Sequence, residues 1–267
     1  MQITFLGTGS SHGIPVLGCD CEVCSSPNPK NRRNRTGVWV KGSDGQSGII
    51  DISSEFRVSS LQYGLKTVDW LLLTHTHSDH ISGLDDLRIF SQRHGKATPI
   101  YADQRSIEDV KYRFAYAFNS TKNYGGGVPQ FDMHEIKNEF SNDRSNNFSN
   151  EFYLGTTKIV PLPILHGPES ILGFRLNDFA FITDVTVIPD STIVMMQGLE
   201  ALALDCLRPD PHSTHLGLDQ AIEYAKKIGA QKTYFIHMTH ELEHEATEKK
   251  LPEGIFMAYD GLTLNLR

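Results

Sequence analysis

The segment 75–80 concentrates metal-binding side chains. It contains His75, His77, Asp79 and His80, and it directly follows the largely apolar run 68–74. Imidazole and carboxylate groups are ligands for zinc, manganese and iron. Because one cation cannot readily take all four groups from so short a loop, we expect two adjacent cations that draw further ligands from elsewhere in the chain.

A second group of metal-binding side chains consists of Cys19, Cys21 and Cys24. Three cysteines so close together make a poor disulfide framework for a reducing compartment, whereas thiolates are good zinc ligands. A closed structural zinc site needs a fourth ligand. Cys206, the remaining cysteine, follows a buried apolar run, so we expect it to be a core thiol.

Short apolar strands alternate with helices in two successive halves of the chain, which predicts a layered α/β domain spanning 1–267. The run 68–74 is continuously apolar and therefore predicts a strand buried on both faces. We expect strands at 3–6, 37–41, 48–52, 68–74, 99–101, 158–162, 171–176, 179–182, 201–204 and 233–236, helices at 53–63, 83–93, 103–118, 218–228 and 241–249, and a terminal hairpin formed by 255–258 and 262–266. Residues 119–150, rich in glycine and polar residues, are expected to form a mobile, loop-rich insertion.

The motif His-x-His-x-Asp-His after an apolar strand resembles the metallo-β-lactamase-fold hydrolases. That family's pattern continues with a histidine, an aspartate and a histidine, each after a strand, and His166, Asp184 and His237 occur in that order. The resemblance covers nearly the whole chain and implies an αββα sandwich. It also implies two ligand sets bridged by Asp184, which are His75, His77 and His166 for one ion, and Asp79, His80 and His237 for the other.

The same resemblance implies hydrolysis by a hydroxide that bridges two divalent ions. Zinc or manganese, with iron as an alternative, would lower the pKa of the parent water and neutralise phosphoryl oxygens. Two such ions, the carboxylates of Asp79 and Asp184, and one hydroxide leave a charge of about +1, which suits one anionic phosphodiester. Asp51 resembles the family's aspartate after an early strand, and we expect it to support a metal ligand.

His240 lies three residues after His237. Together with the Cys-x-Cys-x-x-Cys loop, this spacing resembles the phosphodiesterases of the carbon–phosphorus lyase pathway, which cleave 5-phosphoribosyl 1,2-cyclic phosphate. The resemblance implies that His215 protonates the leaving group, a role that the pKa of imidazole suits. It also implies a structural zinc bound by Cys19, Cys21, Cys24 and His240.

Four further side chains are candidates for substrate contacts. Arg32, Arg33 and Arg35 lie in a basic loop, and guanidinium groups match phosphate oxygens bidentately. A solvated basic loop is the alternative interpretation. His12 lies in the glycine-rich loop 7–15, which we expect to approach the metals.

The formal net charge of −7 argues against general nucleic-acid binding, which needs a basic field. The chain has no apolar run of the roughly 18 residues that a membrane span needs, and its start does not resemble a signal peptide. We therefore expect a cytoplasmic enzyme acting on a small phosphodiester, such as phosphoribosyl 1,2-cyclic phosphate or a cyclic nucleotide. A homodimer is compatible with the sequence.

Three alternatives stay open at this point. A tRNA 3′-end ribonuclease of the same fold would need an arm for the tRNA, which the sequence does not reveal. A hydrolase of pyrroloquinoline quinone biosynthesis would share the cysteine loop, but the complete histidine motif favours a working dinuclear centre. A non-catalytic metal-binding or nucleotide-sensing module is disfavoured by the same ligand set.

Overall fold

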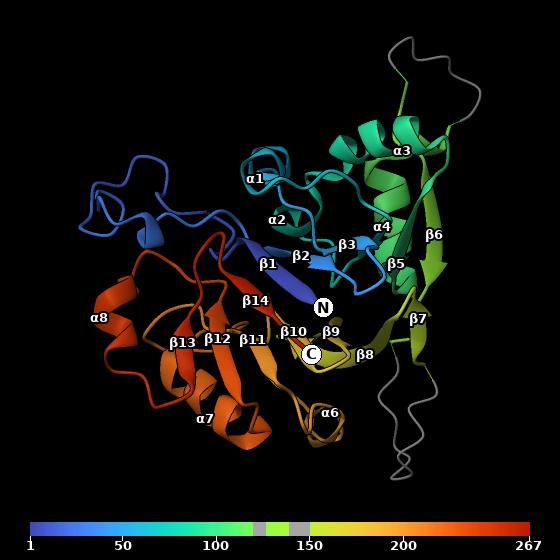
Figure 1. Cartoon of the computed structure of the whole chain (residues 1–267). Helices are drawn as coiled ribbons and strands as arrows, with labels where there is room; N and C mark the ends of the chain where they lie inside the picture. Colours follow the sequence, from blue (N-terminus) through green and yellow to red (C-terminus); the bar gives the residue numbers. More distant parts are fainter. Residues whose placement is uncertain (120–126, 139–149) are drawn as a thin grey trace.

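Two seven-stranded sheets face one another in the computed structural model, which describes residues 1–119, 127–138 and 150–267 (Figure 1). The first sheet has the order β14 (Thr263–Asn265), β1 (Gln2–Gly7), β2 (Gly37–Lys41), β3 (Ser47–Ile50), β4 (Trp70–Leu72), β5 (Thr98–Ala102) and β6 (Phe131–Glu135). The second has the order β13 (Ile255–Met257), β12 (Lys232–Ile236), β11 (Ala201–Asp205), β10 (Phe179–Ile182), β9 (Glu169–Leu176), β8 (Thr157–His166) and β7 (Phe152–Leu154).

An apolar core fills the space between the sheets. Phe5 of β1 lies against Tyr234 of β12, with 6.2 Å between the ring centroids. Strands of the first sheet are buried on both faces, as β4 illustrates. Its Trp70 and Leu72 belong to the core between the sheets, whereas Leu71 packs under the outer helices. The continuous apolar run in the sequence is thus explained by burial of this strand on both faces, as expected.

Helices cover the outer face of each sheet and complete the expected αββα sandwich. The first sheet is covered by α1 (Phe56–Tyr63), the 3₁₀ helix η2 (Leu84–Leu87), α3 (Arg88–His94) and α4 (Gln104–Arg113), and the second by α6 (Asp190–Met195) and α7 (Leu218–Ile228). The short helices η1 (Pro29–Asn31), α2 (Ser78–Ile81), α5 (Ala115–Phe118) and α8 (His244–Glu248) lie in connections. Among the described residues, no helix is long and apolar enough to cross a membrane.

Parallel pairing brings the carboxyl ends of several strands to one edge of the molecule. In the first sheet β3 and β4 are parallel, and in the second β10, β11 and β12 are parallel. β8 and β10 are both antiparallel to β9, so β8 ends at the same edge. Residues that follow these strands therefore meet, although they are far apart in the sequence.

The stretch 119–150 corrects the expectation of a loop-rich insertion. Its residues 131–135 form β6, which pairs in parallel with β5 along five residues at the edge of the first sheet. The sequence FDMHE is half polar because an edge strand is exposed on one side, so it lacked the apolar signal of the inner strands. Residues 120–126 and 139–149 of the expected insertion lie outside the described residues.

The expected C-terminal hairpin is also wrong. β13 pairs with β12 in the second sheet, whereas β14 pairs with β1 in the first. The turn at Asp260 and Gly261 thus carries the chain from one sheet to the other. A turn motif between two apolar runs cannot distinguish this crossing from a hairpin, because both need the same local reversal.

Candidate metal centre

Three polar residues that follow strands adopt the left-handed backbone conformation. Asp51 after β3, Asp184 after β10 and His237 after β12 have φ angles of 58°, 53° and 60°. This region is uncommon for residues with a side chain, and such conformations concentrate at functional sites. Each kink ends the strand geometry at once, so the side chain faces the shared edge of the two sheets.

The seven expected ligand residues come together at that edge. They form two groups in which the potential ligand atoms all lie within 4.8 Å of one another. Asp184 belongs to both groups, as expected for a bridging carboxylate. The groups are His75, His77, His166 and Asp184, and Asp79, His80, Asp184 and His237.

The hydrogen bonds around the imidazoles leave one nitrogen of each ring facing the group. His75 Nδ1 donates to Thr74 Oγ1 at 3.0 Å, and His166 Nδ1 donates to the Thr214 carbonyl at 2.7 Å. Within the two ligand groups, the buried nitrogens without a hydrogen-bond partner in the described part of the chain are His75 Nε2, His80 Nε2 and His237 Nδ1. Each such atom costs about 1–3 kcal/mol when left unsatisfied, and two metal ions, one in each group, would satisfy all three. The donor set therefore fits a metal centre.

Asp51 supports the ligand loop through hydrogen bonds to Thr74 and His80. Its carboxylate accepts hydrogen bonds from the backbone N–H of Thr74 at 2.9 Å, from Thr74 Oγ1 at 2.8 Å and from His80 Nδ1 at 2.7 Å. One fully buried carboxylate thus fixes the start of the ligand loop and the tautomer of His80, which agrees with the supporting role expected for Asp51.

Burial favours the neutral form of most of these imidazoles, which is the form that binds metals, whereas the charge of Asp184 opposes this effect. Burial lowers the pKa of His75 well below its ordinary value, and it also lowers the pKa of His166 and His237. His80 differs, because burial lowers its pKa but the carboxylates of Asp79, Asp184 and Asp51 outweigh burial and raise it well above the ordinary value. Binding of a cation at His80 therefore requires release of its proton.

His215 and Asp205 lie beside the second group. His215 Nε2 is 3.9 Å from Asp184 Oδ2, and its Nδ1 is 3.3 Å from Asp205 Oδ1. Asp205 is fully buried and also accepts from the backbone N–H of Leu216 at 2.9 Å. Sequence analysis had missed Asp205, although its place at the end of a buried strand was a usable signal.

The cysteine loop meets His240 as the sequence resemblance implied. The Sγ atoms of the three cysteines lie 3.4, 3.4 and 3.5 Å from His240 Nδ1. Tetrahedral zinc with ordinary Zn–S and Zn–N bonds places sulfur and nitrogen about 3.5 Å apart, so the cluster fits that ion. The members are Cys19, Cys21, Cys24 and His240. Cys206 is fully buried in the core of the second half, as expected.

Arg33 corrects the expectation of a substrate contact. It is 1% exposed, and its guanidinium donates to the carbonyls of Thr239 at 2.9 Å and Leu242 at 2.7 Å. It therefore stabilises the segment that joins His237 to the cysteine cluster. A buried arginine in a polar loop is indistinguishable by sequence from an exposed one.

The other substrate-contact candidates lie outside both ligand groups. Arg35 donates to the Ser11 carbonyl at 2.7 Å and pairs with Glu55. Arg32 and His12 are exposed in their loops.

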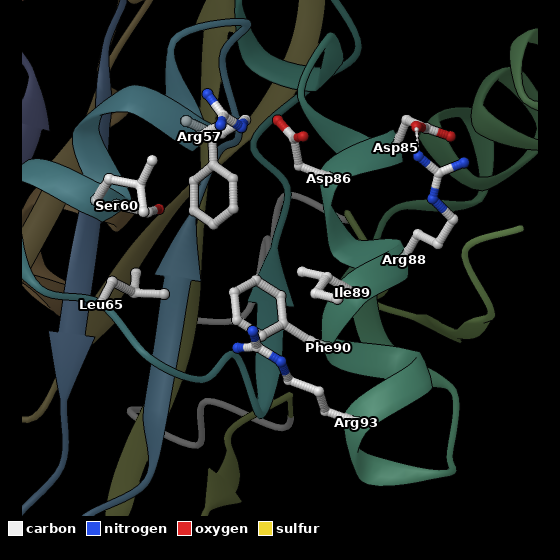
Figure 2. Close-up of a pocket in the computed structure, with 11 residues that line it drawn as sticks. Arg57, Ser60, Leu65, Asp85, Asp86, Arg88, Ile89, Phe90 and Arg93 are labelled. Atoms are coloured by element: carbon white, nitrogen blue, oxygen red, sulfur yellow. Dashed lines mark ion pairs between the residues drawn. The ribbon is translucent and has the colours of Figure 1, made fainter. Parts of the chain in front are cut away.

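A hollow of about 330 Å³ lies elsewhere, in the helical layer over the first sheet (Figure 2). Phe56, Leu65 and Phe90 are among its apolar lining residues, and Arg88 and Asp85, which form an ion pair, also line it. It shares no residue with either ligand group.

Comparisons with known proteins agree with this arrangement. A family model described as a β-lactamase superfamily domain matches residues 49–238. The crystal structure of a new diphosphatase from the PhnP family is 40% identical, covers 98% of this chain and 96% of its own, and superposes with a TM-score of 0.88. Zinc-bound PqqB from Methylobacterium extorquens is 17% identical, with a TM-score of 0.76 and full coverage of both chains, and shows the fold alone.

A curated relative is longer than this chain. The octanoyltransferase of Porphyromonas gingivalis is 33% identical over 264 residues, which are 98% of this chain and 51% of that protein. The present chain thus spans about half the length of that relative.

Replacing Cys21 with serine should remove about one metal ion per chain and lower the Tm by roughly 5–10 °C, because a structural zinc contributes directly to folding free energy. Elemental analysis and scanning calorimetry measure both effects. Cys206→Ser is the control, since it removes a buried thiol outside the cluster and should leave the metal content unchanged. Wild-type metal content and Tm in Cys21→Ser would refute the structural site.

Asp51→Asn should weaken metal binding at the His80 group by about 10–100-fold, since an amide cannot accept all three hydrogen bonds that the carboxylate accepts. Asparagine tolerates the left-handed backbone, so the fold should persist. Metal titration by calorimetry gives the affinity. Asp69→Asn, which alters a carboxylate that accepts from the Ser47 N–H, is the matched control. Equal affinities in wild type and Asp51→Asn would exclude the supporting role.

Proposed function

The chain belongs to the β-lactamase superfamily and is similar in sequence to a PhnP-family diphosphatase, and from this premise we propose that it is a metal-dependent hydrolase of small phosphodiesters or diphosphates. The observation that carries the proposal is a single carboxylate, Asp184, shared by two ligand groups, with the His215 imidazole 3.9 Å from it.

Two divalent ions, zinc or manganese with iron as an alternative, would be held by His75, His77, His166 and Asp184, and by Asp79, His80, Asp184 and His237. When bound, they supply an activated water and neutralise phosphoryl oxygens. The protein's own contribution is to fix the ligands. Thr74, Asp51 and the Thr214 carbonyl orient the imidazoles, so that little reorganisation accompanies the reaction.

We assign His215 as the proton donor to the leaving oxygen. Burial lowers its pKa, but the hydrogen bond and charge of Asp205 outweigh burial and raise the pKa above its ordinary value. The raised pKa extends the pH range in which the imidazole carries its proton, and Nε2 faces the ligand groups. Asp205 positions it through Nδ1, so the two residues together act as an oriented general acid.

The charge of the centre favours this substrate class. Two divalent ions, two carboxylates and one hydroxide leave about +1, which matches one phosphodiester anion. Diphosphatase activity of the PhnP-family relative supports a diphosphate, and the sequence resemblance supports phosphoribosyl 1,2-cyclic phosphate or a cyclic nucleotide. A large nucleic acid is disfavoured by the net charge of −7. Octanoyl transfer belongs to a protein of about twice this length and is not carried over.

Asp184→Asn should reduce hydrolysis of bis(4-nitrophenyl) phosphate by at least about 1,000-fold, because the shared carboxylate is lost while asparagine preserves size and backbone conformation. Release of 4-nitrophenolate by the manganese- or zinc-loaded enzyme measures the rate. Asp190→Asn, which changes an exposed carboxylate at the start of α6, is the matched control. Near wild-type turnover in Asp184→Asn would remove this carboxylate from the centre and with it the proposed mechanism.

Asp205→Asn should move the alkaline limb of the pH–kcat profile to lower pH by about one unit or more. The sign follows from the role of His215. Activity is lost as pH rises through the pKa of the acid, and removal of the neighbouring charge lowers that pKa. The effect should be large for an alkyl leaving group and small for 4-nitrophenolate, which needs little protonation. A profile that is unchanged with both leaving groups contradicts the assignment of His215.

A further inference from the structure

An exposed ion pair lies beside the metal-binding groups and takes no part in holding a ligand. Arg105 Nη2 is 2.8 Å from Glu169 Oε1, and the two side chains are 69% and 40% exposed. Arg105 stands in the first turn of α4, over the first sheet, and Glu169 begins β9 in the second. The pair therefore connects the two halves of the molecule at the surface.

Both partners are anchored on segments that carry metal ligands. Glu169 is paired with His166 in the register of the β8–β9 turn. On α4, Asp109 lies one turn after Arg105 and hydrogen-bonds with Thr76, the residue between His75 and His77. His77 is the exposed member of its ligand group, whereas the other members are buried. The group therefore opens to solvent at His77, and the two partners of the ion pair belong to segments that contact the ligand loop and the ligand His166.

A second set of contacts fixes the spacing of the two partners. Asn138 Nδ2 donates to Asp103 Oδ2 at 3.2 Å, and Ser170 Oγ donates to Asn138 Oδ1 at 3.1 Å. Asp103 caps the N-terminus of α4, and Ser170 follows Glu169. The backbone on both sides of the ion pair is therefore held in place without the ion pair itself.

Two of the three arginines that the sequence favoured for phosphate binding already have buried or charged partners. Arg33 is buried against the Thr239 and Leu242 carbonyls, and Arg35 pairs with Glu55. Arg105 is instead an exposed guanidinium held by a single carboxylate. An exposed ion pair contributes little to stability, so exchanging its carboxylate for a phosphoryl group carries only a small penalty.

We propose that Arg105 binds the phosphoryl group of the substrate that does not react, and that Glu169 holds the guanidinium at the opening until that group replaces it. The planar guanidinium matches phosphoryl oxygens bidentately, which a point charge cannot do. The inference rests on the proposed function and adds to it a residue that recognises a second phosphoryl group. No bond is formed or broken at Arg105, which serves recognition only.

The test uses two chromogenic substrates that differ only in a second phosphate, thymidine 5′-(4-nitrophenyl phosphate) and its 3′-phosphorylated form. With the metal-loaded chain, Arg105→Gln should raise KM for the 3′-phosphorylated substrate about tenfold and leave KM for the other unchanged. Arg105→Lys should recover only part of the loss, because lysine lacks the fork geometry. Glu169→Gln should lower KM for the 3′-phosphorylated substrate, since the guanidinium loses its competing partner.

Arg88→Gln is the matched control, because Arg88 also forms an exposed ion pair on a helix but lies at the remote hollow (Figure 2). It should change neither KM. Equal changes of KM for both substrates in Arg105→Gln, or a change in kcat alone, overturn the recognition role and indicate a structural one.

A binding measurement separates this inference from the proposed function. Methylenediphosphonate, a diphosphate analogue that resists hydrolysis, is titrated into the metal-loaded wild type and Arg105→Gln by calorimetry. If the wild type hydrolyses neither substrate, the proposed function fails, and about tenfold weaker binding in Arg105→Gln still supports the inference. Equal binding by the two proteins overturns it.

Discussion

The structure depends on one constraint, which is that a buried carboxylate at the centre must be surrounded by groups that compensate its charge. Asp184 is 2% exposed, and His75, His80, His215 and His237 all lie within 3.9 Å of its oxygens. Burial raises its pKa, but the neighbouring histidines, His237 first, hold it well below the ordinary value. A charge buried in this way is costly unless it is paired, so the ends of strands from both sheets must converge on it.

The same constraint explains why the two metal-binding clusters are joined. His237 ends its strand in the left-handed conformation, and His240 follows three residues later in the cysteine cluster. Arg33 donates to the carbonyls of Thr239 and Leu242 and so holds this short segment from inside the protein. The cysteine cluster therefore fixes a long N-terminal loop to the segment that positions a central ligand. Its role is structural, but it lies only three residues along the chain from the central ligand His237.

The parts of the site that the sequence could predict are those with dense local patterns. One loop contains His75, His77, Asp79 and His80, and another contains the three cysteines. Metal binding by both loops could therefore be predicted from the local spacing alone, without knowledge of the fold. Asp184 and His237 were predictable only through the order of a family pattern. Asp205 had only its place at the end of a buried strand as a signal, and Arg105 had none, since their roles arise from His215 and Glu169, which other segments bring beside them. Arg33 was wrongly expected to contact substrate, because a buried side chain in a loop produces no periodic pattern in the sequence. The strand β6 was missed because an edge strand is half polar.

The residues that the sequence could predict and those that it could not differ in function. In the proposed function, the metal ions act on the reacting phosphoryl group, which any phosphodiester shares, so one centre can serve many substrates on the same fold. Selection among substrates must then come from groups at the opening, where α4, the β8–β9 turn and the segment after β6 meet. Those segments pack on the apolar core through residues such as Ile107, Val110 and Ile136, whereas their exposed polar side chains can change without loss of the fold. The set of metal ligands therefore indicates the type of reaction, whereas Arg105 and its neighbours determine which substrate binds.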